Sequence, residues 1–131
     1  MKSRTVVVDS DVIIWALRGN EKAVSMLDQI APFEMSAMTW GELMVGAKNK
    51  QEIRGLKNLM KSWDAGIIHF DEGISVRALN LVTDFWLSDS LNINDALIAA
   101  TAIEHQLMLL TGNAKHFRCV PALELETFVP H

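Results

Sequence analysis

The chain has 131 residues, half of them apolar, and a formal net charge of −4. Its length suits one domain with a substantial core, and the absence of Pro-, Gly- or Ser-rich linkers argues against disorder. The acidic total excludes a protein that holds nucleic acid by bulk positive charge, so any contact with RNA must be local. No apolar run approaches the ~20 residues needed to cross a bilayer, and the single cysteine, Cys119, cannot form an internal disulfide. We therefore expect one soluble, unsecreted domain over residues 1–131, with Cys119 as a small buried hydrophobe.

Short apolar and β-branched runs predict five strands. The first run, residues 5–8, ends abruptly at Asp9, as expected for a strand buried on both faces of a parallel sheet. Four more runs have strand character, at residues 33–36, 66–70, 107–110 and 123–128. Helical patterns separate them, starting from about residue 11 and then covering residues 21–30, 39–47, 51–63, 72–87 and 95–106. This alternation predicts an α/β sandwich in which helices flank a mainly parallel sheet of about five short strands.

Polar residues mark where several of these helices should begin. Thr39, with Glu42 three residues later, has the pattern of a capping box, and Asp71 and Asn94 can each cap the helix that follows. Residues 96–103 are apolar almost all round, so their helix is expected inside the sandwich rather than on its surface.

Four acidic residues deserve comparison as candidates for a functional site, because each also has an ordinary structural explanation. Asp9 lies at the carboxyl end of a strand, where open parallel sheets bind ligands, but with Ser10 it could equally cap the next helix. Glu42 projects away from the apolar face of its helix and could be a solvated capping residue. Asp95 opens an apolar helix, where it needs either the helix dipole or a cation to stay ionised. Asp11 is better explained as a first-turn acid than as a ligand.

Carboxylates gathered at one site would repel one another and hold protons unless a divalent cation neutralised them. A set of oxygen ligands suits Mg²⁺ or Mn²⁺, and no spacing of cysteine and histidine suggests zinc. The four histidines, His69, His105, His116 and His131, are scattered, so we do not expect them to be ligands.

Several sequence blocks follow one another in a specific order. They are VVVDSDVII, then WGELMVGA, then NINDALIAATA, then LLTGNAKHF followed by VPALELETF. In this order they resemble the successive motifs of VapC-type PIN-domain ribonucleases, the toxins of bacterial toxin-antitoxin pairs. The resemblance covers nearly the whole chain, and DALIAATA followed by the pattern T-x-N-x-x-H-F is its most specific part. It implies a PIN-like three-layer sandwich.

The resemblance also implies a site and a reaction. Asp9, Glu42 and Asp95 would be the catalytic, metal-binding acids, with Mg²⁺ or Mn²⁺ as the cofactor, and Thr111 and Asn113 would stand beside them. The implied reaction is hydrolysis of phosphodiester bonds in tRNA, rRNA or mRNA by water that the cation activates, without a side-chain nucleophile.

The chain departs from the fuller family pattern in the loop after the fourth strand. Many PIN nucleases have a fourth acid there, whereas this chain has Asn113 at one candidate position and His116 at the other. Asn113 can bind a hard cation or its water through an amide oxygen but adds no charge. Asp11 could supply the missing charge, although a site with three acids is the preferred interpretation. Ser10 has no base predicted near it and is interpreted as a capping or water-positioning hydroxyl.

A basic stripe and two protein partners complete the predictions. Lys50, Arg54, Lys57 and Lys61 recur at helical spacing and could hold RNA phosphates, or could form an ordinary solvated face. By resemblance, a cognate antitoxin would lie across the early helices and send a segment into the acidic site. The toxin would pair as a homodimer in the bacterial cytoplasm.

Three other functions are compatible with parts of the sequence. VVVDSDVI also matches the opening of haloacid-dehalogenase-like phosphatases, although the later acidic pair of that family is missing. A response-regulator receiver also binds Mg²⁺ through acids at a strand end, and Asp71 lies near the third predicted strand. A PIN-like binding module with impaired catalysis would explain the amide at Asn113.

Overall fold

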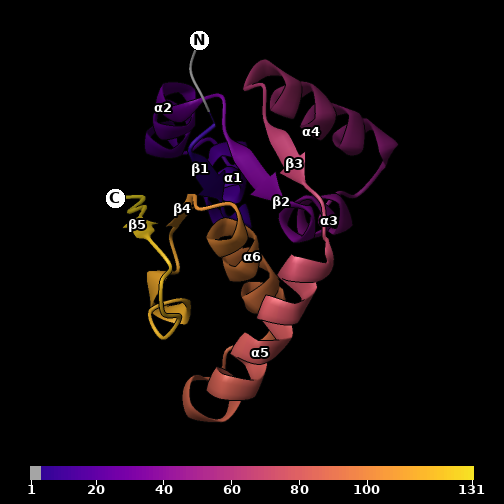
Figure 1. Ribbon diagram of the computed structural model, residues 1–131. Helices are drawn as coiled ribbons and strands as arrows, with labels where there is room; N and C mark the ends of the chain where they lie inside the picture. The colour runs from indigo at the N-terminus through magenta and orange to yellow at the C-terminus, as the bar shows by residue number, and fades with distance from the viewer. Residues whose placement is uncertain (1–3) are drawn as a thin grey trace.

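The computed structural model describes residues 4–131, in which five strands form one sheet between two layers of helices (Figure 1). The strands are β1 (Val6–Val8), β2 (Glu34–Ser36), β3 (Gly66–Ile68), β4 (Met108–Thr111) and β5 (Leu125–Thr127). They lie in the order β3-β2-β1-β4-β5, and every neighbouring pair is parallel. The predicted α/β sandwich with a parallel sheet is confirmed. Residues 1–3 of the predicted domain lie outside the described residues.

The helices follow the predicted order with small shifts at their ends. They are α1 (Ser10–Leu17), α2 (Glu21–Ile30), α3 (Ala37–Val45), α4 (Lys50–Ser62), α5 (Glu72–Asp89) and α6 (Ile93–Glu104). A short 3₁₀ helix that was not predicted, η1 (Ala114–His116), follows β4. Within residues 4–131, none of the helices combines the length and apolar character that a transmembrane span requires.

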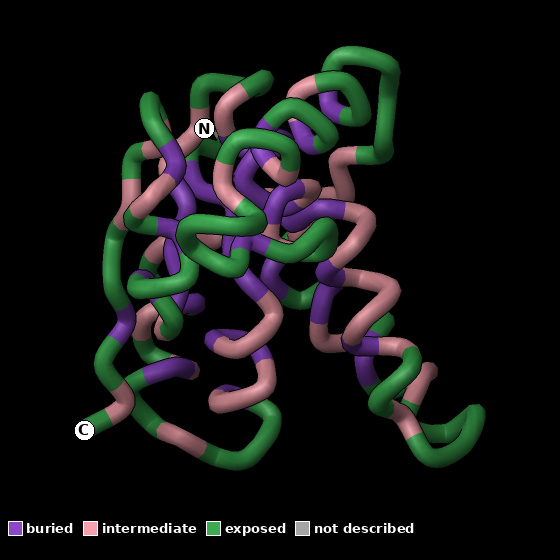
Figure 2. Tube along the Cα trace, turned by 90° about the horizontal axis from the view of Figure 1, so that it is seen from below, coloured by how far each residue is buried: buried purple, intermediate pink, exposed green. Residues whose placement is uncertain are grey.

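Alternate residues of the central strands build two separate halves of the core. Val6 and Val8 of β1 face α1 to α4, whereas Val7 faces α5 and α6. Leu110 and Leu109 of β4 divide in the same way. This period of two is what a strand buried on both faces requires. Figure 2 shows the buried stretches gathered in the middle of the molecule, with exposed segments around them.

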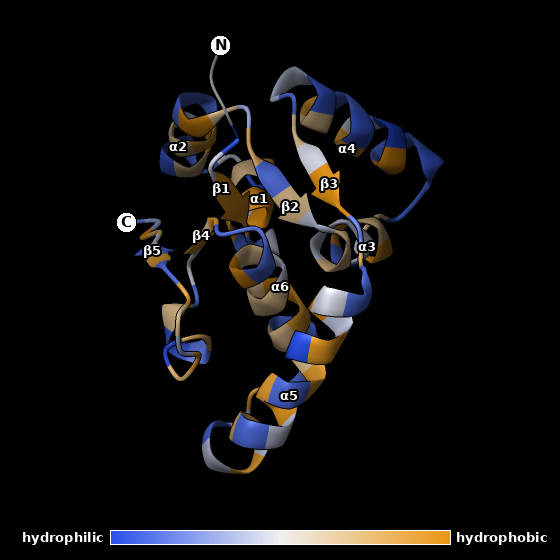
Figure 3. Cartoon of the chain, viewed as in Figure 1, coloured by the Kyte–Doolittle hydropathy of each residue, from blue (hydrophilic) through white to orange (hydrophobic). Residues whose placement is uncertain are grey.

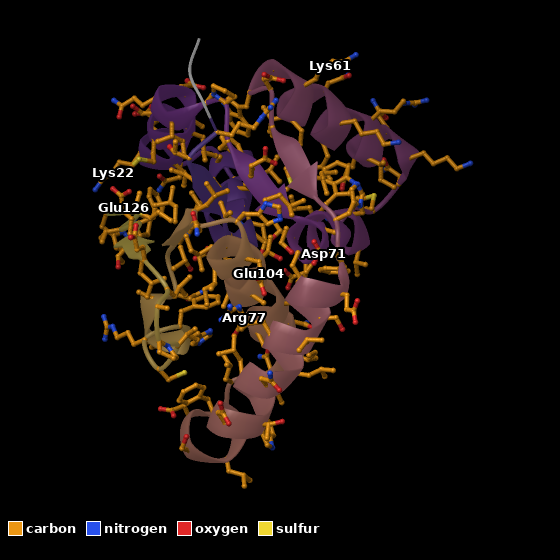
Figure 4. The ribbon with its side chains drawn as sticks, in the orientation of Figure 1. Lys22, Lys61, Asp71, Arg77, Glu104 and Glu126 are labelled. Carbon is orange, nitrogen blue, oxygen red and sulfur yellow. The ribbon has the colours of Figure 1, made fainter. Side chains whose placement is uncertain are left out.

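Helix α6 is buried as predicted, and an ion pair joins it to α5. Six of its alanine, isoleucine and threonine side chains are completely or almost completely enclosed: Ala96, Ile98, Ala99, Ala100, Thr101 and Ala102. Arg77 of α5 and Glu104 of α6 face each other, with Arg77 Nε 3.2 Å from Glu104 Oε1 (Figure 4). Beyond this pair, the turn between the two helices projects from the body of the molecule (Figure 1).

Only one of the three predicted helix caps from the middle of the chain is correct. Asp71 accepts a hydrogen bond from the amide three residues later and caps α5. The predicted cap at Thr39 is wrong, because Ser36 caps α3 directly at the end of β2 and Thr39 is buried within the helix. The predicted cap at Asn94 is wrong as well, because Asn92 caps α6 by accepting a hydrogen bond from the amide three residues later. In both cases an earlier residue with equally good capping chemistry is used, since the exit of the chain from the preceding element fixes where the helix begins.

The strand order locates the place where a ligand is expected. From β1 the chain builds outward to β2 and β3, and then returns to add β4 and β5 on the other side of β1. The direction of the order therefore reverses between β1 and β4, and ligands of open parallel sheets bind in the crevice at such a switch point. Asp9 follows β1 there, and Thr111 ends β4. Receiver domains have the order 2-1-3-4-5, so the topology contradicts the receiver interpretation.

A core substitution tests the second half of the core. Phe117 is fully buried among residues of α5, α6 and β4. Phe117→Ala is expected to lower the free energy of unfolding by about 3–5 kcal/mol, because it leaves a cavity that the sandwich cannot close. Urea unfolding measures this loss. The control is Leu87→Ala at a side chain that is 93% exposed, for which a change within about 0.5 kcal/mol is expected, and equal losses in the two variants would contradict the assignment.

Candidate active site

Asp9 occupies the switch point, where its buried carboxylate accepts hydrogen bonds from two donors. Its Oδ1 accepts from the Ser10 amide at 2.8 Å, so Asp9 does cap α1. Its Oδ2 accepts from the Thr111 hydroxyl at 2.8 Å, and its own amide donates to the Leu110 carbonyl at 2.9 Å. Burial raises the pKa of Asp9, and the hydrogen bonds from Thr111 and Ser10 oppose that rise. Asp9 therefore both caps α1 and lies at the end of β1, where a ligand is expected.

Glu42 reaches the same site from α3. It is half-buried, and the Ser10 hydroxyl donates to its Oε1 at 3.4 Å. Burial raises the pKa of Glu42, and repulsion from Asp9 and Asp95 raises it further. The interpretation of Glu42 as a solvated capping residue is wrong, because α3 begins at Ala37 and the face that carries Glu42 lies against α1.

Ser10 therefore lies nearer to a carboxylate than the sequence analysis expected. The Glu42 oxygen at 3.4 Å is a base within reach, so the statement that Ser10 has none nearby is wrong in geometry. The contact is long, and a carboxylate is a weak base toward a serine hydroxyl. Ser10 thus connects Asp9, which its amide contacts, with Glu42, which its hydroxyl contacts.

Asp95 stands in the first turn of α6, with a carboxylate that is 21% exposed. Burial raises its pKa first and repulsion from Asp9 second, while His116 lowers it. His116 Nδ1 lies 3.6 Å from Asp95 Oδ2 and comes from η1, on the far side of β4 in the sequence. The prediction that His116 is one of four scattered histidines is therefore wrong, because His116 lies beside Asp95. The sequence feature that points to His116 is the T-x-N-x-x-H-F pattern, in which it is the histidine.

Asp11 is the fourth carboxylate of the group. Its Oδ2 accepts from the Gly112 amide at 2.9 Å, whereas its Oδ1 is buried and has no hydrogen-bond partner among the described residues. Burial and the nearby charge of Asp9 raise the pKa of Asp11 to about 6. Asp11 is a first-turn acid of α1, as predicted, but its carboxylate is turned toward the β4–η1 loop.

The loop after β4 carries the two remaining predicted site residues. Thr111 is fully buried against Asp9, and its hydroxyl also accepts from the Asn113 amide at 3.0 Å. The Asn113 residue is exposed beyond it. Thr111 is therefore in contact with the acidic group, while the contribution of the Asn113 side chain stays a prediction.

Three of the four carboxylates, those of Asp9, Glu42 and Asp95, fit a divalent cation by their chemistry. Asp9 raises the pKa of Asp11, Glu42 and Asp95, so their negative charges lie close enough to repel one another. The donors of the Asp9, Glu42 and Asp95 side chains are carboxylate oxygens, the ligands that a hard divalent cation prefers. Within residues 4–131, no three acidic, histidine or cysteine side chains lie close enough together to hold a metal ion as they stand. Carboxylates that repel one another stand apart, and a cation would draw them together.

A groove leads away from Glu42 between α1, α3 and α4. Its volume is about 700 Å³, and Glu42, Arg18 and Glu52 are its charged residues. The remaining lining is apolar or glycine: Ile14, Leu17, Leu43, Gly46, Ala47, Gly55, Leu56 and Leu59. The site therefore opens onto a channel that suits an apolar segment more than a polyanion.

The basic stripe of α4 faces outward. Lys50, Arg54, Lys57 and Lys61 are all exposed, and none of them lines the groove that contains Glu42. Figure 3 shows the hydrophilic face of α4 on its outer side, and Figure 4 shows Lys61 at the edge of the molecule. The RNA contact of this stripe stays a prediction, and the structure places no described residue of the acidic group on its face.

Comparison with known proteins identifies the class that this fold and site define. Residues 6–122 match the family model of the PIN domain, so the chain belongs to the PIN-domain family. Among curated proteins, it is 32% identical over 131 aligned residues to "Ribonuclease VapC" of Rickettsia bellii, with 93% of this chain and 95% of that protein covered. The predicted family is confirmed, and the haloacid-dehalogenase interpretation is not supported.

Solved structures give the same result. The chain resembles a toxin-antitoxin complex from Klebsiella pneumoniae with a TM-score of 0.78 and 28% identity, over 97% of this chain and 98% of that one. It also resembles VapBC2 from Rickettsia felis bound to a promoter DNA fragment, with a TM-score of 0.77, 24% identity and coverage of 95% and 98%. The second likeness shows the fold alone. The predicted PIN-like three-layer sandwich is confirmed.

The raised pKa of Asp11 predicts an unusual dependence of stability on pH. The folded value of about 6 lies above the ordinary 3.8, so the folded state binds this proton more tightly than the unfolded state. The contribution is complete below about pH 4 and is lost as the pH rises through about 6. The melting temperature of the cation-free protein should therefore fall from about pH 5 to about pH 7. Asp11→Asn should flatten that fall in melting temperature. The control Asp84→Asn, on the exposed side of α5, should show the same fall as the wild type. A wild-type melting temperature that rises over this interval would contradict the prediction.

Proposed function

We propose that this protein is an endoribonuclease toxin that hydrolyses RNA phosphodiester bonds with the help of a divalent cation, Mg²⁺ or Mn²⁺. The observation that carries the proposal is the group of Asp9, Glu42 and Asp95 at the β1/β4 switch point of a PIN domain. Burial raises all three pKa values, and repulsion from Asp9 adds to the rise at Glu42 and Asp95. Such a group is costly for stability alone and is suited to a cation. The ribonuclease activity named for the Rickettsia bellii relative agrees with this chemistry.

The three acids are the residues that would hold the cation. When bound, a divalent cation lowers the pKa of water and offsets negative charge that develops on a phosphoryl group. Asp9 is held in place by the Ser10 amide and the Thr111 hydroxyl, and the Ser10 hydroxyl turns toward Glu42. These contacts orient two carboxylates before any ligand arrives, which is the preorganisation that an electrostatic site needs.

Removing one acid tests the proposal. Purified protein should cleave a mixed pool of tRNA and rRNA with Mg²⁺ or Mn²⁺ and should stop cleaving in EDTA. Asp95→Asn keeps the size of the side chain and leaves the backbone amide that Asn92 caps. It should lower the cleavage rate by roughly 100-fold or more, as when one electrostatic group of an active site is lost.

The matched control for this experiment is Asp84→Asn, which removes an equal charge from the exposed face of α5. It should cleave at the wild-type rate. If folded, cation-supplied wild-type protein that is free of antitoxin cuts none of the RNAs, the function is instead that of a PIN-like RNA- or protein-binding module with impaired catalysis. The amide at Asn113 would then be the leading reason.

We further propose that the groove beside Glu42 takes a segment of a cognate antitoxin. The structures that resemble this chain include toxin-antitoxin complexes, and the groove is the apolar channel that ends at an acid of the site. An apolar segment with a basic residue at its tip would match both the walls of the groove and the charge at its end. The early helices α1 and α3 form two of its walls, in agreement with the expected position of the antitoxin.

Filling the groove tests this second proposal. A Cβ atom on Gly55 would meet no heavy atom within 4 Å, so a larger residue fits α4 there. Gly55→Trp should fill the groove and weaken inhibition of cleavage by a co-expressed antitoxin, whereas Gly55→Ala should leave the groove open and stabilise α4 by up to about 1 kcal/mol. The measurement is the cleavage rate with and without antitoxin. Equal inhibition of the Gly55→Trp and Gly55→Ala proteins would contradict the proposal.

We also propose that the protein pairs as a homodimer in the bacterial cytoplasm. Apolar side chains of α5 are exposed, among them Val76, Leu79 and Trp86, and a second copy would cover them. The compartment follows from the family and from the toxin role that we propose.

A further inference from the structure

The first turn of α1 is bonded to the end of β4 and its following loop by three successive contacts. The Asp9 amide donates to the Leu110 carbonyl at 2.9 Å, and the Thr111 hydroxyl donates to the Asp9 carboxylate at 2.8 Å. The third contact is the Gly112 amide, which donates to Asp11 Oδ2 at 2.9 Å. The third contact extends the connection beyond the last residue of β4, into the segment that leads to η1.

The contact between Asp11 and Gly112 requires a residue without a side chain at position 112. A Cβ atom at position 112 would lie 2.3 Å from Asp11 Oδ2, which is closer than real contacts allow. The same Cβ atom would lie 3.6 Å from the Phe128 carbonyl, so the carboxylate has the backbone of residue 128 close by. Phe128 in turn donates its amide to the Thr111 carbonyl at 2.8 Å. Position 112 thus lies between the Asp11 carboxylate, which its amide binds, and the backbone of residue 128.

We infer that Asp11 is a positioning residue whose carboxylate fixes the β4–η1 loop over the acidic site, and that it is not itself a cation ligand. Through Gly112 it holds Thr111 against Asp9, and it sets where Asn113 and His116 stand. This role rests on the proposed function, since it describes how the same site is built. The partner of the Asp11 carboxylate is a backbone amide 101 positions away in the sequence.

The two roles make opposite demands on a conservative variant. Asp11→Asn removes the charge but keeps a carbonyl-type oxygen that can accept from the Gly112 amide. Asp11→Ala removes both. If Asp11 is a cation ligand, both variants should bind the cation more weakly. If Asp11 is a positioning residue, Asp11→Asn should keep the cation affinity and Asp11→Ala should lose it.

The experiment measures the loop and the cation separately. Hydrogen exchange of the Gly112 amide is followed by NMR in cation-free protein, and Mn²⁺ affinity is measured by calorimetry, for wild type, Asp11→Asn, Asp11→Ala and Asp95→Asn. Asp11→Asn should keep the Gly112 amide protected and bind Mn²⁺ much as the wild type does. Asp11→Ala should lose the protection and bind Mn²⁺ roughly 10- to 100-fold more weakly, the usual cost of removing a residue that orients a metal ligand.

Two results would overturn the inference. One is a loss of Mn²⁺ affinity in Asp11→Asn as large as that in Asp95→Asn, which would make Asp11 a ligand. The other is unchanged Gly112 exchange in Asp11→Ala, which would remove the anchor. If the wild type binds no Mn²⁺ and cleaves no RNA, the proposed function fails, and the Gly112 exchange still decides whether Asp11 holds the loop.

A further variant, Gly112→Ala, tests the same contact in case Asp11→Ala does not fold. Gly112→Ala should displace the Asp11 carboxylate and expose the position-112 amide to exchange. The same change should do much less when Asp11 is already alanine, because the atom in its way is gone. Additive effects of the two changes on Mn²⁺ affinity would contradict a direct Asp11–Gly112 contact. Asp84→Ala, on the exposed side of α5, is the control for loss of an acid that positions nothing in the site.

Discussion

The constraint on which the rest of the site depends is the burial of the Asp9 carboxylate at the end of β1. A buried carboxylate without donors would be strongly destabilising, and this one is enclosed with only 5% of the residue exposed. Its donors come from α1 and from β4, and the parallel pairing of Val8 with Leu110 sets the distance between them. A shift of that register by one residue would turn Thr111 to the other face of the sheet and leave Asp9 without the hydroxyl.

The tripeptide from Asp9 to Asp11 extends this constraint to the neighbouring elements. Asp9 binds β4, Ser10 reaches Glu42 on α3, and Asp11 binds the loop after β4. Three adjacent residues therefore connect the two sides of the switch point and also contact α3. The fold and the site are stabilised by the same contacts, so substitutions here alter stability and chemistry together.

Much of the fold could be predicted because its signals are local. The abrupt end of the β-branched run at Asp9 and the all-round apolar pattern of α6 both follow from burial, which the sequence records directly. The cap of α3 was mispredicted because Ser36 and Thr39 have the same chemistry and only the exit from β2 chooses between them. Asp11 and His116 were undervalued for a different reason. Their partners, the Gly112 amide and the Asp95 carboxylate, are distant in sequence, and a backbone amide has no letter in the sequence.

The distribution of charge has a consequence for RNA binding. Phosphates that approach Asp9, Glu42 and Asp95 meet three carboxylates that already repel one another, and the exposed bases of α4 lie outside the groove at Glu42. A divalent cation removes that repulsion, so cation and RNA favour each other's binding in the proposed site. By linkage, each then raises the affinity for the other by the same factor. An acidic protein can on these terms hold RNA without a large basic surface, because the charge that attracts the phosphate arrives with the cofactor.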